Sequence, residues 1–422
     1  MGKGAQNPLI LPKSAKELLS GPSYAAKVLA AEDAWIADVD FALFHKEVHE
    51  LGKTLAKEQG EADVAHLQKI IWWSRLCQYI GVATMWWRVN PISIFFLSLG
   101  TLTRWTIVAH HVCHGGFDKC STEYNRFKFG VGSLFRRVVD WLDWMLVEAW
   151  NVEHNQLHHY HLGEDSDPDL VETNMAYLRE MQVPKGVKYV AVLYIALTWK
   201  WWYYAPNTFK QLKATERRKR GQEILGRGPL TFDFKWLIGR GDQTFFNSTE
   251  FLVRCLLPYF VQRFALLPLP LAFFSRSAYF SAMVNLILAE LMTNLHSFIV
   301  VATNHAGDDL YRFERHCKPR SATFYLRQII SSANFATGTD VGDFLQGWLN
   351  YQIEHHMWPD LSMLSYQKAQ PIVHQLCRKH GVPYVQQNVF YRIKKLVDIM
   401  VGDANMRKFP TAFEREADLV ED

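Results

Sequence analysis

The chain has 422 residues, of which 49% are hydrophobic and 14% aromatic, and its formal net charge is only +4. With a mean hydropathy of −0.11, this composition argues against both a simple soluble enzyme and a uniformly hydrophobic transporter. No basic tract interleaved with aromatic residues is present, so we expect no nucleic-acid partner. The six cysteines lack paired spacing, which is typical of reduced thiols facing the cytosol. We therefore expect a membrane anchor that carries a large polar cap.

The first part of the chain, residues 1–69, is predicted to be a cytoplasmic helical segment, because its apolar residues recur at helical spacing. It begins without the apolar stretch that marks a secretory signal peptide. Two apolar stretches follow at about 70–87 and 92–110, each close to the roughly 20 residues that cross a bilayer. They are predicted to form a transmembrane hairpin.

Three further apolar stretches lie at 187–205, 251–274 and 279–303. They cannot all cross the membrane if both ends of the chain remain on one side. A basic run at 210–220 is expected to be cytoplasmic or to face lipid headgroups. We therefore expect 187–205 to lie in the interface and the other two stretches to form a second hairpin. The alternative hairpin, 187–205 with 279–303, leaves the ends on the same side.

Eleven of the 17 histidines fall into four groups at the cytoplasmic ends of these spans or in cytoplasmic segments. A single histidine on an apolar face is usually a satisfied core residue, but that explanation does not suit so many beside membrane spans. The groups are His110, His111 and His114; His154, His158, His159 and His161; His296 and His305; and His355 and His356.

The spacing within the first two groups indicates metal ligands. His110 and His114 are four residues apart on a predicted helix, so both imidazoles point from one face toward one metal. His154 and His158 repeat this spacing. His159 lies about 100° further round the helix, where it can reach a second metal.

The adjacent pair His355 and His356 favours two neighbouring metal ions in the same manner. A structural zinc ion would need only four ligands. Imidazole suits zinc, copper, iron and nickel, but zinc lacks redox chemistry and the clustered Cys and Met that favour copper are absent. The pattern therefore favours two iron ions with room for O₂.

The predicted fold class is an all-α integral membrane protein with about four transmembrane helices in two hairpins. A cytoplasmic helical cap holds the di-metal site.

Carboxylates close to these histidines are candidates for orienting the imidazole rings, since an acceptor on the second nitrogen fixes the ring and its tautomer. Glu354 precedes the adjacent pair, and Asp165, Asp167 and Asp169 follow the second group. A solvated acidic turn around Pro168 is the alternative for the three aspartates.

Three motifs resemble the histidine boxes of membrane fatty acid desaturases: His110-x-x-x-His114, His154-x-x-x-His158-His159 and Gln352-Ile-Glu-His355-His356. The third is the most specific. The stretch 349–359 resembles front-end acyl desaturases, in which Gln replaces the usual first His of this box. The likeness covers roughly residues 70–395, which define the predicted membrane domain, and leaves 396–422 as a tail.

The resemblance implies that two irons are bound by His110, His114, His154, His158, His159, His305, His355 and His356, with Gln352 in the place of a ninth ligand. Neighbouring or purely structural roles are expected for His111, His161, Asp167, Asp169, His296, Asn304 and Glu354. The chain departs from the front-end pattern at position 111, where His stands for the usual Asp. Its second box also has three residues before the doublet instead of two.

No His-Pro-Gly-Gly haem motif is present, so a fused cytochrome b5 domain is not expected. Electrons are expected from a separate carrier, either cytochrome b5 or, in a plastid, ferredoxin. The resemblance implies O₂-dependent desaturation of a fatty acyl chain carried by a lipid or by CoA in the membrane. The endoplasmic reticulum is favoured over the plastid, with the active site facing the cytosol or stroma.

Two kinds of alternative remain open. The first is a hydroxylase, ketolase or acetylenase on the same scaffold, which sequence cannot separate from a desaturase because the ligands are shared. The second is a membrane zinc hydrolase or a metal transporter, for which two adjacent histidine doublets outside the spans are not needed.

Overall fold

The computed structural model describes residues 29–222, 235, 238–240, 242 and 244–420. The first 28 residues of the predicted N-terminal segment and the last two of the tail lie outside the described residues. The described part is mostly helical, as expected. Its strands form two short parallel pairs, β1 (Tyr311–Arg312) with β4 (Arg407–Lys408) and β2 (Ala333–Asn334) with β3 (Val385–Gln386).

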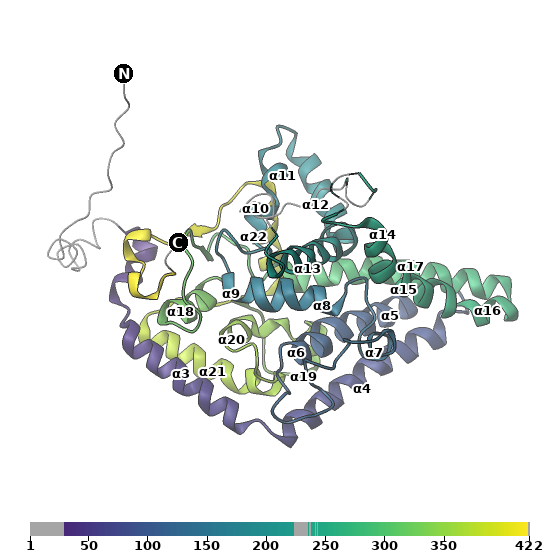
Figure 1. Ribbon diagram of the computed structural model, residues 1–422, viewed down its shortest axis with the longest axis horizontal. Coiled ribbons are helices and arrows are strands. Elements are labelled where there is room, and N and C mark those ends of the chain that lie inside the picture. The colour runs from purple at the N-terminus through teal and green to yellow at the C-terminus, as the bar shows by residue number, and fades with distance from the viewer. Residues whose placement is uncertain (1–28, 223–234, 236–237, 241, 243, 421–422) are drawn as a thin grey trace.

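A 3₁₀ helix, Ala31–Asp38, leads into α3 (Phe41–Glu58), where the Asp40 carboxylate accepts the first free backbone N–H groups. Beyond it, α4 (Glu61–Thr84) and α5 (Pro91–Thr103) form the first hairpin along one edge of the molecule (Figure 1). Asn90 caps α5 by accepting the N–H of Ser93 at 2.8 Å.

Residues 248–274 form a long helix in which α-helical segments alternate with π-helical turns. The chain then turns at Ser275 into α17 (Arg276–Ala302). Helix α17 packs between α5 and α12 (Lys185–Trp199). The Trp199 indole donates to the carbonyl of Asn294 at 3.0 Å. The parts of the 248–274 helix are α14 (Ser248–Phe251), α15 (Leu257–Phe260) and α16 (Leu269–Phe274), with π-helical turns at Leu252–Leu256 and Val261–Leu266.

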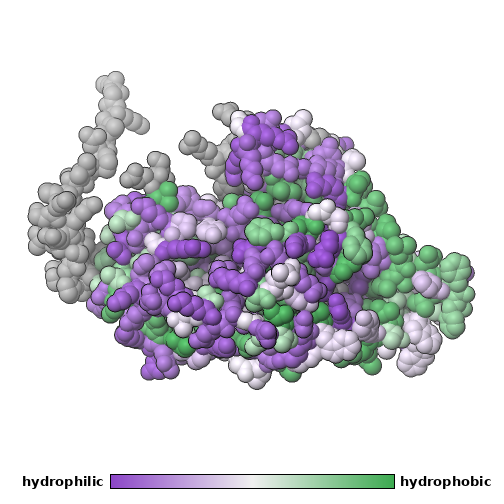
Figure 2. Space-filling view, turned by 60° about the horizontal axis from the view of Figure 1, so that its bottom comes forward, coloured by the Kyte–Doolittle hydropathy of each residue, from purple (hydrophilic) through white to green (hydrophobic). Residues whose placement is uncertain are grey.

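Three helices are long and apolar enough to cross a membrane: Pro91–Cys113, Ser248–Phe274 and Arg276–Ala302. They coincide with three of the predicted spans. Hydrophobic residues gather at the end of the molecule that carries the α16–α17 turn, whereas the remaining surface in that view is largely hydrophilic (Figure 2). The first predicted span lies in α4, which is not among these three helices.

The predicted interfacial stretch 187–205 is part of one continuous helix that joins α12, a π-helical turn at Lys200–Tyr204 and α13 (Ala205–Lys219). Its outer face is apolar: Val190, Leu193 and Tyr194 are exposed.

The basic run at 210–220, which was expected to be cytoplasmic or to face lipid headgroups, is not uniformly exposed. Lys210 is 1% exposed because α13 packs into the protein at this point. Burial lowers the pKa of Lys210 to about 7, against the opposing effect of Glu153. Lys213 and Arg217 are partly exposed and Arg218, Lys219 and Arg220 are exposed, so the end of the run is the part most open to water or headgroups.

The remaining helices form a cap that packs around the apolar helices (Figure 1). Helix α22 (Val389–Val401) crosses residue 395, where the boundary between the membrane domain and the C-terminal tail was predicted. The tail packs against the cap, where Arg315 pairs with Glu416 at 2.8 Å. The cap helices are α6 (His110–Cys113), α7 (Leu134–Asp140), α8 (Val147–Trp150), α9 (His159–His161), α10 (Val171–Asn174), α11 (Ala176–Glu180), α18 (Ala322–Ile330), α19 (Asp340–Leu345), α20 (Gln352–Met357), α21 (Met363–His380) and α22 (Val389–Val401). Short 3₁₀ helices lie at Leu349–Tyr351, Thr411–Phe413 and Glu416–Asp418.

Candidate metal centre

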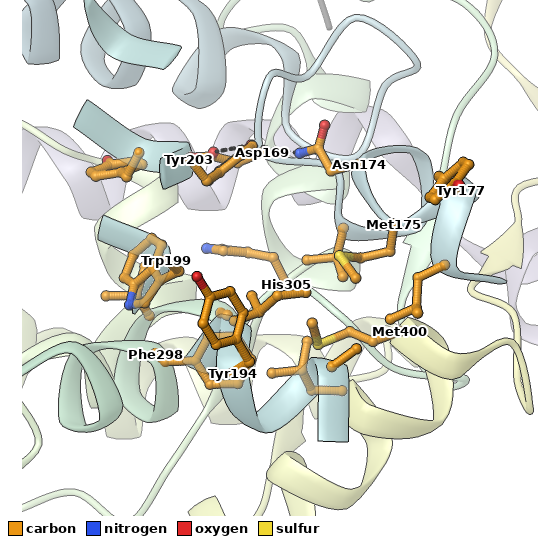
Figure 3. Close-up of a pocket in the computed structure, with 18 of the residues that line it drawn as sticks. Asp169, Asn174, Met175, Tyr177, Tyr194, Trp199, Tyr203, Phe298, His305 and Met400 are labelled. Carbon is orange, nitrogen blue, oxygen red and sulfur yellow. Dashed lines mark hydrogen bonds between the residues drawn. The ribbon is translucent and has the colours of Figure 1, made fainter. Parts of the chain in front are cut away.

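An apolar cavity of about 530 Å³ opens between α11, α12, α17 and α22 and ends at histidines (Figure 3). Most of its wall is aliphatic, aromatic or Met side chains, including Met175, Phe298 and Met400. Its inner end is formed by His154, His158, His305 and Gln352. A cavity of this size and character falls within the range that binds small apolar ligands.

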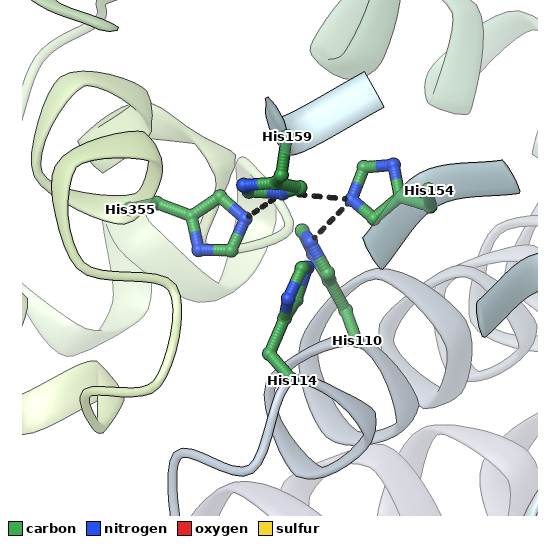
Figure 4. Close-up of side chains that lie close together, drawn as sticks. All are labelled: His110, His114, His154, His159 and His355. Carbon is green, nitrogen blue, oxygen red and sulfur yellow. Dashed lines mark hydrogen bonds between the residues drawn. The ribbon is translucent and has the colours of Figure 1, made fainter. Parts of the chain in front are cut away.

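Five buried imidazoles meet behind this cavity and form the first cluster (Figure 4). Their ligand nitrogens lie within 4.8 Å of one another. Three Nε2–Nε2 distances, from His154 to His110, from His159 to His154 and from His355 to His159, are 3.1, 3.3 and 3.1 Å. The members are His110 and His114 at the end of the apolar helix Pro91–Cys113, His154 and His159 in the second box, and His355 on α20.

A second cluster of three buried imidazoles adjoins the first and consists of His158, His305 and His356. The side-chain amide of Gln352 lies 2.9 Å from the Nε2 of His305 and 3.4 Å from that of His356. The rings of His159 and His356 stack at a centroid distance of 4.1 Å, so the two clusters share a border. All nine predicted ligand side chains are therefore brought together.

The division of the second box differs from the helical prediction. His154 groups with His159, and His158 belongs to the other cluster, although His154 also lies close to His158 and Asp169. The cause is that Asn151–His158 is a π-helix, in which residue i bonds to residue i+5 and each turn holds an extra residue. A wider turn brings residues five apart, such as His154 and His159, toward the side where residues four apart already lie. The predicted division of His355 and His356 between two groups agrees with the structure.

Several imidazoles are held from behind through Nδ1, which leaves Nε2 facing the cluster. His158 donates from Nδ1 to Asp167 at 2.8 Å, as the sequence suggested. His110 Nδ1 lies 3.1 Å from the Thr106 carbonyl. His355 Nδ1 lies 3.2 Å from the hydroxyl of Tyr366 on α21, a partner that sequence reasoning missed because it lies eleven residues away in another helix.

Glu354 has a different role from the one predicted. Its two oxygens accept hydrogen bonds from Asn334 at 2.8 Å and from the Tyr384 hydroxyl at 2.7 Å, and neither is bonded to an imidazole. Burial raises the pKa of Glu354 to about 7. Because α20 turns this side chain away from both clusters, Glu354 fixes the backbone of the third box against β2 and the Tyr384 segment.

Replacing Tyr384 with Phe should lower stability by about 1–3 kcal/mol, because a buried carboxylate oxygen loses its donor. A thermal melt of the purified protein measures this loss. The matched control is Tyr391→Phe, whose ring is 52% exposed and should leave the melting temperature unchanged. Equal melting temperatures for both variants would contradict the assignment of Glu354.

The other residues that were predicted to lie beside the metal ligands differ in their distance from the two clusters. Asp169 lies within ligand reach of His154 and His158, and Asn304 joins α17 to the third box by donating to the Leu349 carbonyl at 2.9 Å. His111 packs against the rings of His110 and His355 without joining a cluster. His161 and His296 lie apart: the first pairs with Glu164 at 2.7 Å and the second bonds to the Leu345 carbonyl at 2.8 Å.

Metal cations would satisfy the facing imidazole nitrogens of the two clusters better than protons alone. Each short Nε2–Nε2 contact needs one protonated and one bare nitrogen. His114 Nε2 and Gln352 Oε1 are buried with no hydrogen-bond partner among the described residues. Burial, reinforced by neighbouring rings, holds the pKa of His114, His154, His159, His355 and His356 well below the ordinary value. Neutral imidazole is the form that binds metals, so both clusters could hold a metal ion.

Comparison with known proteins agrees with this geometry. The chain is 22% identical over 289 residues to an acyl-lipid (9-3)-desaturase of Physcomitrium patens, covering 68% of this chain and 41% of that protein. It is 38% identical over 104 residues to a Delta(8)-fatty-acid desaturase of Euglena gracilis, covering 23% and 22%. It is 41% identical over 59 residues to a chloroplastic acyl-lipid (7-3)-desaturase of Chlamydomonas reinhardtii, covering 14% and 11%.

The matched parts span less than half of the length of each of these relatives. No solved structure matches the chain significantly. The family model described as fatty acid desaturase matches residues 85–388, which is more than half of the chain and includes every member of both clusters. The chain therefore belongs to the fatty acid desaturase family.

Proposed function

We propose that this protein desaturates a fatty acyl chain in an O₂-dependent reaction at a histidine-ligated di-iron centre. The observation that carries the proposal is the meeting of five and three buried imidazoles from distant segments at the end of an apolar cavity. One iron would be held by the first cluster, and the other by the second cluster with Gln352. Two irons would supply the redox chemistry that breaking an unactivated C–H bond requires.

The protein's own part is to place one C–C bond of the acyl chain beside the clusters and to exclude water from it. The apolar wall of the cavity suits an acyl chain. Among the described residues that line the cavity, none is a lysine or arginine, so the part of the substrate that lies there is expected to be uncharged. Asn174, Tyr203 and Asp169 form its polar edge, where Asn174 donates to the Tyr203 hydroxyl at 2.6 Å (Figure 3).

A second, more polar cavity of about 310 Å³ reaches His114, His159 and His356 from the other side of the clusters. Its lining includes three basic residues, Lys53, Arg126 and Arg320, and one acidic residue, Asp360. This arrangement supports delivery of electrons by a separate acidic carrier protein, either cytochrome b5 or ferredoxin, at a face distinct from the substrate cavity.

We further propose four membrane spans in two hairpins, with residues 70–87, which begin within α4, as the span that composition alone does not single out. The spans Pro91–Cys113 and Arg276–Ala302 both end beside the clusters, which supports a site at one membrane surface. That surface is proposed to be the cytosolic face of the endoplasmic reticulum, or the stromal face if the protein is plastidial.

The direct test is lipid profiling of a host that expresses the protein with a suitable reductase. The expected product is an acyl chain with two hydrogens fewer, seen by mass spectrometry. A gain of one oxygen would instead indicate the hydroxylase alternative, and an unchanged lipid profile with active reductase would contradict both.

Filling the cavity should shorten the acyl chain that is accepted. Ala302→Trp places a large ring in the wall beside His305, and each methylene that no longer fits costs about 1–3 kcal/mol in relative reactivity. The control is Val284→Trp on the same helix, where the side chain is 40% exposed. Competition between acyl chains of different length measures the shift. The same preference in Ala302→Trp and Val284→Trp would contradict this cavity as the acyl site.

A further inference from the structure

A third group of metal-binding side chains lies outside both clusters and consists of His161, Glu164 and His316. The Nδ1 atoms of His161 and His316 each lie 2.7 Å from the same oxygen of Glu164, Oε2. Two imidazole nitrogens and a carboxylate oxygen, within 4.8 Å of one another, are the ligand types of three-residue zinc sites that keep water in the fourth position.

The carboxylate of this group is fixed from behind. Glu164 is 2% exposed, and its other oxygen, Oε1, accepts from the Arg327 guanidinium at 2.7 Å and from the Cys317 backbone at 3.1 Å. Oε2 is thereby left facing the two imidazoles. Such bonds to a ligating carboxylate hold it in place for a metal. His161 and His316 are 33% and 41% exposed, so solvent and ions reach the group.

Charge in this region favours an added cation. Arg327 is shared between Glu164 and Glu414, at 2.7 and 3.0 Å, and all three side chains are buried. Arg315 lies 3.8 Å from Glu414 but pairs at 2.8 Å with the exposed Glu416. The two buried carboxylates thus share Arg327, and Glu414 has a longer second contact with Arg315, so an added cation beside Glu164 would complete its neutralisation.

We propose that His161, Glu164 and His316 bind one zinc ion, completed by water. The ion would join the loop after α9 to the segment after β1, which already meet through the Phe313 N–H and the Gly163 carbonyl at 2.8 Å. The loop also carries Asp167, the partner of His158, so the zinc ion would stiffen the support of the second cluster. The proposal uses no member of either cluster and does not depend on the desaturase function.

The test measures zinc per chain in the purified, tag-free, iron-loaded protein after equilibration with zinc, by mass spectrometry of the metal. The wild-type protein should hold one zinc ion more than His316→Ala, and Glu164→Gln should show the same loss. The matched control His374→Ala, an exposed histidine outside every such group, should equal the wild type. Zinc that exchanges into the iron clusters affects all four proteins alike and cancels in the difference.

X-ray absorption at the zinc edge of the wild-type protein keeps the test valid even if a variant fails to fold. The expected ligand shell of the extra zinc is nitrogen and oxygen, including imidazole. Equal zinc in the wild type and His316→Ala would overturn the proposal, as would no zinc uptake by the wild type or a sulfur-containing shell.

Discussion

His355→Ala is expected to abolish product formation without removing the protein from the membrane. His355 is 1% exposed, and its Nε2 lies 3.1 Å from that of His159 within the first cluster. Removing it opens a ligand position and leaves a cavity where a metal-bound ring would stand. Because the loss of one outer support of a ligand typically costs about 10–100-fold in metal affinity or activity, the loss of the ligand itself should cost more. Iron per chain and desaturated product measure the effect.

The matched control for this variant is His374→Ala, which removes an exposed imidazole from α21. It should retain wild-type iron and turnover. Membrane fractionation of both variants separates a lost metal site from a lost fold. Normal turnover by His355→Ala would refute the third box as a metal site.

Asp167→Asn should weaken metal binding at the second cluster by about 10–100-fold, with a matching fall in turnover. Asp167 Oδ1 accepts from His158 Nδ1 at 2.8 Å, and Oδ2 accepts from the Gly163 N–H at 3.1 Å. An amide has only one oxygen, so its NH₂ group would face one of these donors. If the NH₂ group faces His158, the imidazole loses the acceptor that orients it, and if it faces Gly163, the loop that holds residue 167 loses its hydrogen bond. Iron retained during dialysis against a chelator, compared with wild type, measures the change.

Asp165→Asn provides the control from the same acidic turn. The Asp165 side chain is 54% exposed and lies 3.5 Å from Arg312, without contact to either cluster. It should keep wild-type iron. If both variants lose iron to the same extent, the effect belongs to the acidity of the turn and not to the orientation of His158.

The sequence predicted which side chains meet, but not how they divide. His110 and His114 follow the helical spacing rule and fall in one cluster. His154 and His158 also lie side by side, with their rings stacked at a centroid distance of 5.2 Å, but His154 belongs to the first cluster and His158 to the second, on a segment that is a π-helix. The extra residue in such a turn depends on packing and leaves no mark in the hydrophobic periodicity of the chain.

Partners that lie far away in sequence could not be predicted either. Tyr366 and Tyr384 belong to α21 and the segment after it, and reach His355 and Glu354 only after the cap has folded. Lys210 was expected at the surface because charge usually lies there, but the packing of α13 buries it. Three of the predicted spans coincide with helices that are long and apolar enough to cross a membrane, because hydrophobic length can be read directly from the sequence.

Counting the metals tests the central claim most directly. Elemental analysis of the purified wild-type protein, with Mössbauer spectroscopy on a ⁵⁷Fe-labelled sample, should find two iron ions per chain at the five- and three-histidine clusters. Iron should fall in His355→Ala and in Asp167→Asn. Wild-type protein that holds a single zinc ion and no iron would contradict the account.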